Sequence, residues 1–123
     1  MRDQRGQATV ELVLCLPFVL AVLAGVVQVA LVAGDYVKLW HAAREAARVA
    51  IVDPDPGHAQ AAAERAGLNG VRVTVRPAAT YRVQGRPLTV SLTYSPSGGV
   101  PVLGDIASAL EFHARASMRI EQP

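Results

Sequence analysis

The chain is poor in cysteine, aromatic residues and net charge, and each shortage excludes a class of protein. Its 123 residues include one cysteine, Cys15, so an internal disulfide framework is impossible. Aromatic residues make up 5% of the chain, which leaves little material for stacking nucleic-acid bases. The formal net charge is only +2, far from the basic footprint of a nucleic-acid-binding domain. We therefore expect neither a disulfide-stapled domain nor a nucleic-acid partner.

The histidines, carboxylates and glycines form no recognisable catalytic or ligand-binding pattern. His41, His58 and His113 fall in separate predicted elements, without the paired spacing of metal ligands. Asp53 and Asp55 resemble the start of a calcium loop, but prolines intervene and the later ligands are missing. The sequence has no GxSxG motif and no phosphate-binding glycine loop. We expect a protein that is not an enzyme, with no cofactor, no metal and no small-molecule substrate.

Hydrophobic residues, 51% of the chain, are concentrated near the N-terminus. Residues 12–34 contain no charged side chain, and Gln28 is their only strongly polar residue. As a helix this run is about 34 Å long, enough to cross a hydrocarbon core of about 30 Å. We therefore expect a transmembrane segment over residues 7–34. Arg2 and Arg5 precede it, which favours a cytoplasmic N-terminus and a C-terminal region outside the cytoplasmic membrane.

A carboxylate, Glu11, lies at the edge of the apolar run, five residues after Gly6. An ionisable residue at the membrane is costly and therefore suggests a function. If the chain were cut between Gly6 and Gln7, the new ammonium group could pair with Glu11 of a neighbouring subunit and set the register between helices. Two plainer alternatives remain open. One is a signal anchor with Glu11 at headgroup level, and the other is a secretory signal peptide removed near Gly34.

This start resembles that of type IV prepilins, which have a short basic leader, a glycine, four residues, a glutamate and a long apolar helix. More specifically, it is similar to the TadE-like family of minor pilins (pseudopilins) of the Flp-type, tight-adherence pilus. Leu12 stands where family members often have Tyr or Phe, and Ala46 where they often have Gly, so cleavage after Gly6 stays open. The stretches that carry the resemblance are residues 6–12 followed by Pro17, residues 42–50 and residues 114–121.

The resemblance implies a membrane-anchored, non-catalytic minor pilin or pseudopilin that takes part in assembling a type IVb (Flp/tight-adherence) pilus for cell adhesion. It implies a basic leader of residues 1–6, processing between Gly6 and Gln7 by a prepilin peptidase, and subunit docking through Glu11. The other implied partners are the membrane, other pilin subunits, a platform protein and an assembly ATPase. The alternative is a monomeric, membrane-tethered binding module outside the cytoplasm, with an uncleaved signal anchor. Such an anchor should tolerate Gln or Leu in place of Glu11.

The predicted helix carries candidate positions for bending and for helix contact. Pro17 has no N–H, which predicts a kink in the transmembrane segment. Residues 35–52 continue as an amphipathic helix, because apolar and polar residues recur there at intervals of three and four. Small residues on both segments would allow another element to approach closely. These candidate contact residues are Ala21, Gly25, Ala43 and Ala47.

Residues 53–123 are predicted to form a small α+β region outside the membrane. Prolines and a glycine end the long helix, and residues 58–66 read as a short helix. Apolar and polar residues then alternate in a period of two, with a short helical turn around residues 105–109. We expect a pilin-like fold in which three or four mostly antiparallel strands pack on the amphipathic helix. The alternating stretches are residues 71–76, 88–94 and 110–121. The basic residues near the strands are expected on a solvated strand face, with a binding patch for an acidic partner as the alternative; they are Arg72, Arg76, Arg82 and Arg86.

Overall fold

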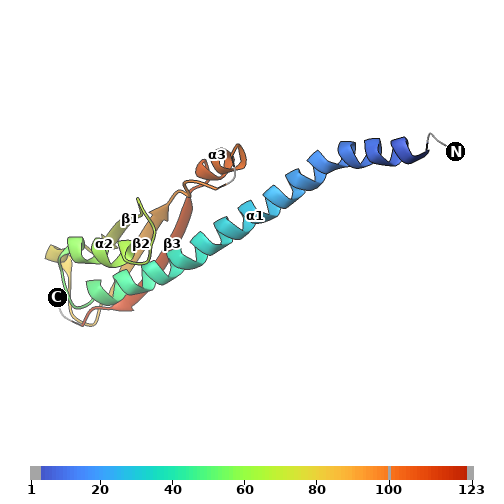
Figure 1. Cartoon of the computed structure of the whole chain (residues 1–123). Coiled ribbons are helices and arrows are strands. Elements are labelled where there is room, and N and C mark those ends of the chain that lie inside the picture. Colours follow the sequence, from blue (N-terminus) through green and yellow to red (C-terminus); the bar gives the residue numbers. More distant parts are fainter. Residues whose placement is uncertain (1–3, 100, 122–123) are drawn as a thin grey trace.

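One long helix, α1 (Gln4–Ala50), forms the axis of the molecule and carries a small sheet at its C-terminal end (Figure 1). The computed structural model describes residues 4–99 and 101–121. Its arrangement confirms the predicted α+β fold, with a long N-terminal helix packed on an antiparallel sheet. The remaining elements are, in order, α2 (Pro56–Glu64), β1 (Arg72–Arg76), the 3-10 helix η1 (Ala79–Tyr81), β2 (Pro87–Tyr94), α3 (Leu103–Ser108) and β3 (Phe112–Arg119).

The sheet has three strands in the order β1-β2-β3, and both pairs are antiparallel. Val90 at its centre lies opposite Val75 of β1 and Ala116 of β3. Because side chains alternate between the two faces of a strand, the apolar residues of all three strands share one face. On β2 that face is fully buried from Leu88 to Tyr94, and it packs on α1.

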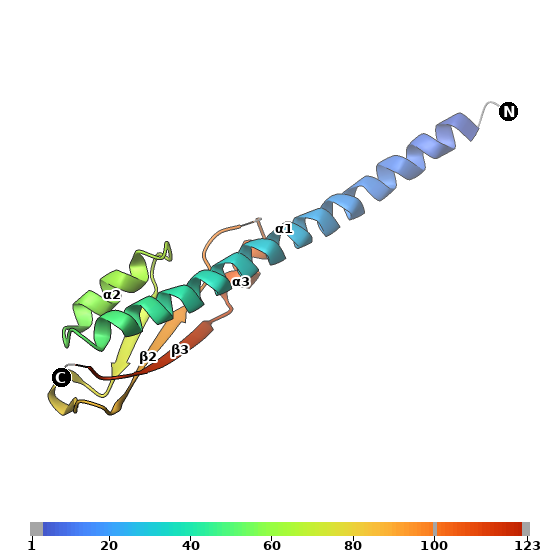
Figure 2. The same ribbon diagram turned by 90° about the horizontal axis from the view of Figure 1, so that it is seen from below.

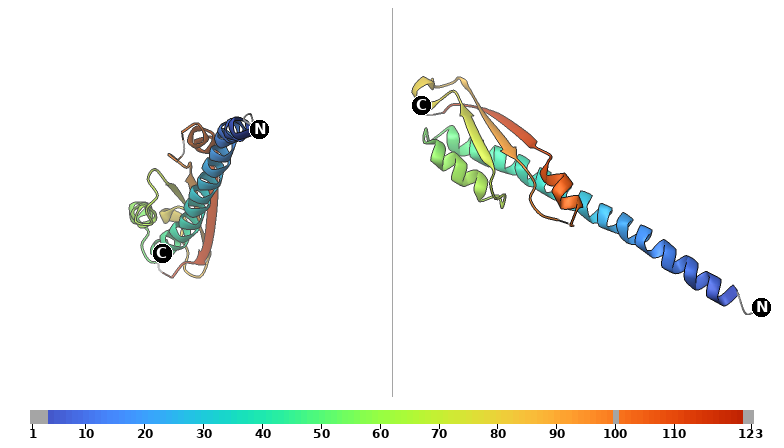
Figure 3. Two further views of the ribbon diagram at one scale, coloured as in Figure 1. Left: turned by 45° about the vertical axis from the view of Figure 1, so that its right-hand side comes forward. Right: turned by 90° about the horizontal axis from the view of Figure 1, so that it is seen from above.

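The core lies between the C-terminal half of α1, the sheet and α2, as Figures 2 and 3 show. On α1 the buried face is made almost wholly of alanines, with Leu39 as its only large member. A small side chain lets two backbones approach closely, so α2 and β2 can both contact the same helix. The buried residues of this face are Leu39, Ala42, Ala43, Ala46, Ala47 and Ala50.

The connection from α1 to α2 is built from short-range polar contacts. Asp55 caps α2, its side chain accepting from the backbone N–H of Gly57, and Pro56 occupies the first turn. This cap explains why α2 begins before residue 58, where the sequence pattern placed the start. The side chain of Gln60 then joins α2 to the sheet. Its Nε2 donates to the Val71 carbonyl, and its Oε1 accepts from the Val73 N–H.

Arg82 does not lie on a solvated strand face, so the prediction for this residue is wrong. It is buried, and its Nη1 donates to the carbonyl of Ala50 at 2.8 Å and to that of Asp53 at 3.2 Å. The chain after η1 folds back over the end of α1, and the guanidinium satisfies a carbonyl of its last turn. A cation at this end is also favoured by the helix dipole.

Replacing Arg82 by Met should destabilise the domain by about 2 kcal/mol, because hydrogen bonds from a charged donor contribute about 1.5–3 kcal/mol. Met keeps much of the apolar stem and removes only the donors. The control is Arg86→Met, an exposed arginine four residues away. Urea unfolding of the full chain in mild detergent can be followed by the fluorescence of Trp40, which packs against the core. Equal midpoints for the two variants would contradict the capping role.

Candidate functional site

Within the part of the chain that the structure describes, no other element packs on the first turns of α1. From Gly6 to Leu23 every residue is exposed, and Phe18 is 75% exposed. Among the described residues, Gly6–Ala50 is the one helix long and apolar enough to cross a membrane, and its most apolar window is entirely unburied. Figure 3 shows this half extending away from the sheet. So large an apolar surface on all sides of a helix is suited to lipid or to neighbouring helices.

Gly6, Gln7 and Glu11, predicted for processing and docking, all lie exposed on the first turns of α1. Gln7 and Glu11 are four residues apart, so they occupy the same face of the helix one turn apart. A Cβ atom on Gly6 would meet nothing within 4 Å. The structure leaves this segment open to an outside partner, and the roles of the three residues stay predictions.

The other predicted helix positions fall into different surroundings. Helix α1 continues through Pro17, where the kink remains a prediction, and Ala21 is exposed. Gly25 is half-buried. Ala43 and Ala47 are fully buried in the chain's own core, so the element that approaches them closely belongs to the same molecule.

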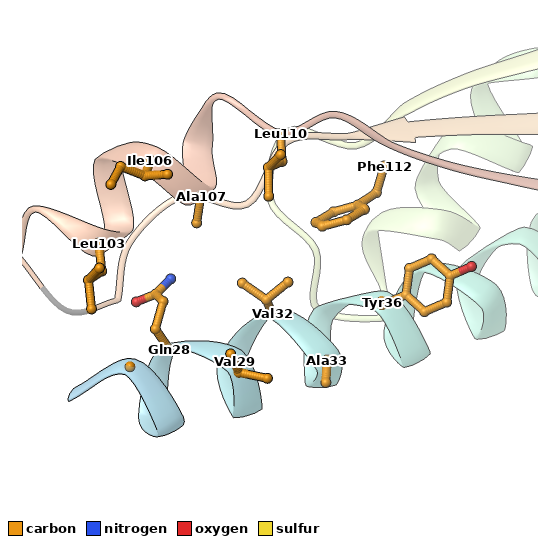
Figure 4. A pocket seen from close by; sticks show the side chains of 11 residues that line it. Gln28, Val29, Val32, Ala33, Tyr36, Leu103, Ile106, Ala107, Leu110 and Phe112 are labelled. Carbon is orange, nitrogen blue, oxygen red and sulfur yellow. The ribbon is translucent and has the colours of Figure 1, made fainter. Parts of the chain in front are cut away.

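Sequence reasoning missed a hollow between α1 and α3, shown in Figure 4. It has a volume of about 520 Å³. Gln28 and Val32 point into it from α1, and Leu103, Ala107 and Leu110 face them from α3 and the following residues. Its walls are almost wholly hydrocarbon. The helical spacing of the apolar residues in 103–110 was a signal for a covering helix, but nothing local indicated what it covers.

The polar side chain of Gln28 is buried at this hollow, with 8% of the residue exposed. The loop before α3 comes so close that a Cβ atom on Gly99 would lie 2.3 Å from Gln28 Oε1. Gly99 also has a φ of +113°, a conformation that favours glycine. The one strongly polar residue of the apolar run is thus covered by protein.

At the C-terminal end of the hollow, α1 acquires polar and aromatic partners. Asp35 accepts a hydrogen bond from the Tyr94 hydroxyl at 3.3 Å and lies 3.6 Å from Lys38 Nζ. Burial is the main cause that raises the pKa of the Tyr94 hydroxyl, and the nearby Asp35 carboxylate raises it further. Tyr36 meets the rings of Trp40 and Phe112 edge to face. Asp35 therefore marks the level at which the helix environment becomes polar.

The outward face of the sheet is basic and rich in hydroxyl groups. Arg72 and Arg76 lie on it as predicted, whereas Arg82 does not. Arg115 and Arg119 of β3, not included in the prediction, lie on the same face. The outward positions of the three strands carry no carboxylate, and the hydroxyl residues among them are Thr74, Thr89, Ser91, Thr93 and Ser117.

Among residues 4–99 and 101–121, no three His, Cys, Asp or Glu side chains lie close enough together to hold a metal ion. His58 instead pairs with the Asp53 carboxylate in the connection between α1 and α2. This pairing raises the pKa of the His58 imidazole. The pKa of Asp53 is lowered, first by the hydrogen bond from the Asp55 backbone N–H and then by His58. Asp53 and Asp55 thus build a turn.

These features define a protein with one long apolar helix that fits a single-pass membrane anchor and continues without a break into a small α+β domain. Residues 6–48 match the family model described as TadE-like protein, which confirms the resemblance predicted from the sequence. The matched segment lies wholly within α1, so the helix alone carries the family signal. Neither the curated proteins nor the solved structures gave a match to the chain.

Stability should fall as pH rises through the raised pKa of His58. A histidine whose pKa is raised in the folded state stabilises that state. This stabilisation is fully present below the pKa of the unfolded chain, 6.5, and is lost as the pH rises through the pKa of the folded chain. The contribution of Asp53, whose pKa is lowered, is present above 3.8 and is lost only in acid. The unfolding midpoint should therefore decline from about pH 6 to about pH 8, by a small amount because the pair is exposed.

The variant His58→Gln should lack this decline. His113→Gln is the matched control, because His113 is exposed and its side-chain contact is with the hydroxyl of Thr93, not with a carboxylate. An identical pH profile for wild type and His58→Gln would contradict the linkage.

Proposed function

We propose that this protein is a minor pilin or pseudopilin that takes part in assembling a type IVb (Flp/tight-adherence) pilus. The observation that carries the proposal is a helix that is exposed on every side from Gly6 to Leu23 and has a carboxylate, Glu11, near the start of its apolar run. The TadE-like match over residues 6–48 supports the pilus system as its setting. The role is structural, and the chain itself catalyses nothing.

The proposed mechanism is an exchange of surroundings around the N-terminal half of α1. Before assembly, lipid contacts its apolar side chains, which cover the full circumference of the helix. In a filament, or at its base, helices of other pilin subunits replace the lipid. This exchange leaves the α+β domain intact, because the core of that domain starts at Leu39.

Glu11 would set the register between the helices of neighbouring subunits. A prepilin peptidase would cut between Gly6 and Gln7, which creates an ammonium group on Gln7. Since Gln7 and Glu11 share one face of the helix, both charges can be presented to neighbouring subunits. Pairing the ammonium group with Glu11 of a neighbour offsets the cost of removing both charges from water.

The proposed location is the cytoplasmic membrane of a bacterial envelope, with a single pass, the N-terminus inside and the domain outside. Arg2 and Arg5 before the apolar run support this orientation. The other proposed partners are a platform protein and an assembly ATPase at the cytoplasmic side.

A second candidate function is a monomeric, membrane-tethered binding module with an uncleaved signal anchor. The observation that favours it is the outward face of the sheet, where Arg72, Arg76, Arg115 and Arg119 stand without a carboxylate among the outward positions. Such a face suits an acidic partner. In this case Glu11 would be dispensable.

Replacing Glu11 by Gln should abolish pilus assembly while leaving membrane insertion intact. Breaking a buried charge pair costs about 3–5 kcal/mol, so piliation should fall by more than about tenfold. The matched control is Glu45→Gln, an exposed carboxylate on the same helix beyond the apolar run. Pili are counted on cells of the native bacterium, and membrane fractions are checked for the protein. Normal piliation with Glu11→Gln would contradict the pilin role and favour the tethered module.

A further inference from the structure

We propose that residues 101–110, which include α3 and which we call the α3 foot, rest in the outer boundary of the lipid bilayer. The exposed apolar side chains of the foot would contact lipid there and fix how deeply α1 is inserted. The inference rests on the proposed membrane anchoring, but not on pilus assembly.

The α3 foot lies beside the apolar part of α1. The hollow beneath it is lined by α1 residues from Gly25 to Tyr36 (Figure 4). Gly25 precedes Gly34, the end of the expected transmembrane segment, by nine residues, or about 14 Å of helix. Part of the domain therefore reaches back along a stretch of α1 that the sequence assigned to lipid.

The exposed surface of the α3 foot is itself apolar. Val102, Ile106 and Leu110 follow one another at intervals of four residues, and they are 72%, 63% and 50% exposed. Leu103 and Ala107 line the hollow toward α1, and Ile106 and Leu110 border it while staying exposed. A short helix with apolar side chains on both sides is suited to a nonpolar environment. The exposed carboxylate of Asp105 limits the depth, because it belongs at headgroup level.

The buried position of Gln28 indicates the same environment. A polar amide in hydrocarbon is costly unless protein covers and satisfies it. The loop at Gly99 closes over Gln28, so closely that a Cβ atom there would force the Gln28 amide to move. The chain thus shields its one strongly polar side chain at the level where lipid would otherwise reach it.

The length of the predicted transmembrane segment agrees with an outer hydrocarbon boundary near Gln28. Residues 7–34 form a helix about 42 Å long, which exceeds a hydrocarbon core of about 30 Å by about 12 Å. That surplus equals the length of residues 27–34, the stretch of α1 beside which the α3 foot lies. Irregular backbone exposed to lipid is not tolerated inside the hydrocarbon, so the loop before α3 lies at or outside the boundary.

A boundary near Gln28 places the other edge of the core near Ala8, about 20 residues earlier. Glu11 then lies within the hydrocarbon edge instead of outside it. The α3 foot would thereby hold the Glu11 carboxylate at a depth where an unpaired charge is costly, so that pairing with a neighbouring subunit would offset that cost.

Fluorescence quenching in lipid nanodiscs tests the position of the foot. In full-length protein carrying Cys15→Ala, a single cysteine is introduced by Ile106→Cys and labelled with a small environment-sensitive fluorophore. Phosphatidylcholine brominated on its acyl chains quenches from the lipid side, and iodide quenches from water. Leu20→Cys in the exposed apolar helix and Tyr81→Cys, 77% exposed on η1, are the lipid and water controls. Leu110→Cys is a second reporter on the same stripe.

The label at residue 106 should be quenched by brominated lipid several-fold more than the label at residue 81, and it should be protected from iodide. Residue 110 should behave in the same way. If residues 106 and 110 respond like residue 81 while residue 20 responds to lipid, the foot lies in water and the inference is overturned. If residue 20 also fails to respond to lipid, membrane anchoring itself is wrong. Neither outcome depends on the piliation result for Glu11→Gln.

Discussion

The structure depends on one constraint, which is that a single unbroken helix must satisfy two environments. From Val10 to Leu23, α1 has large aliphatic side chains that are exposed in the described structure, and its last turns have alanines buried by the sheet and α2. The change of residue size along the helix is the physical basis of both parts. Large side chains maximise contact with lipid or neighbouring helices, whereas Ala43 and Ala47 let two elements pack on one narrow helix.

The small domain could not be separated from this helix. Three short strands and a nine-residue helix bury few large side chains of their own, and no disulfide joins them. A sheet of this size needs a packed helix for stability. Arg82 ties the sheet region to the end of α1, and the Glu121 N–H donates to the Ile51 carbonyl just beyond it. Any force on the helix in an assembly would therefore be carried directly into the domain.

Periodicity in the sequence predicted those elements whose partners are local or repetitive. The alternation of apolar and polar residues around Val90 and Ala116 predicted the strands. The recurrence of apolar residues at intervals of three and four predicted that α1 continues beyond the apolar run. The burial of Arg82 and the position of the α3 foot were beyond such reasoning, because both arise where segments distant in the chain meet. The sequence around Arg82 is typical of a solvated arginine near strands, and it does not show that the end of α1 lies close enough to accept its hydrogen bonds. Likewise, Gln28 gives no sign that a loop seventy residues later covers it. Gly6, Gln7 and Glu11 were found from spacing alone, and their function requires partners outside this chain.

In the proposed function, the N-terminal helix lies in the membrane and the segment before Gln7 is a leader that is removed. Measuring the intact mass of the protein purified from its native membrane tests this most directly. The expected species begins at Gln7 and keeps the whole apolar helix. A species that begins near Asp35 would contradict it, because the helix would then be a discarded signal peptide and the remaining domain a secreted protein. A full-length mass would contradict the processing step and leave an anchored protein without the new ammonium group for Glu11.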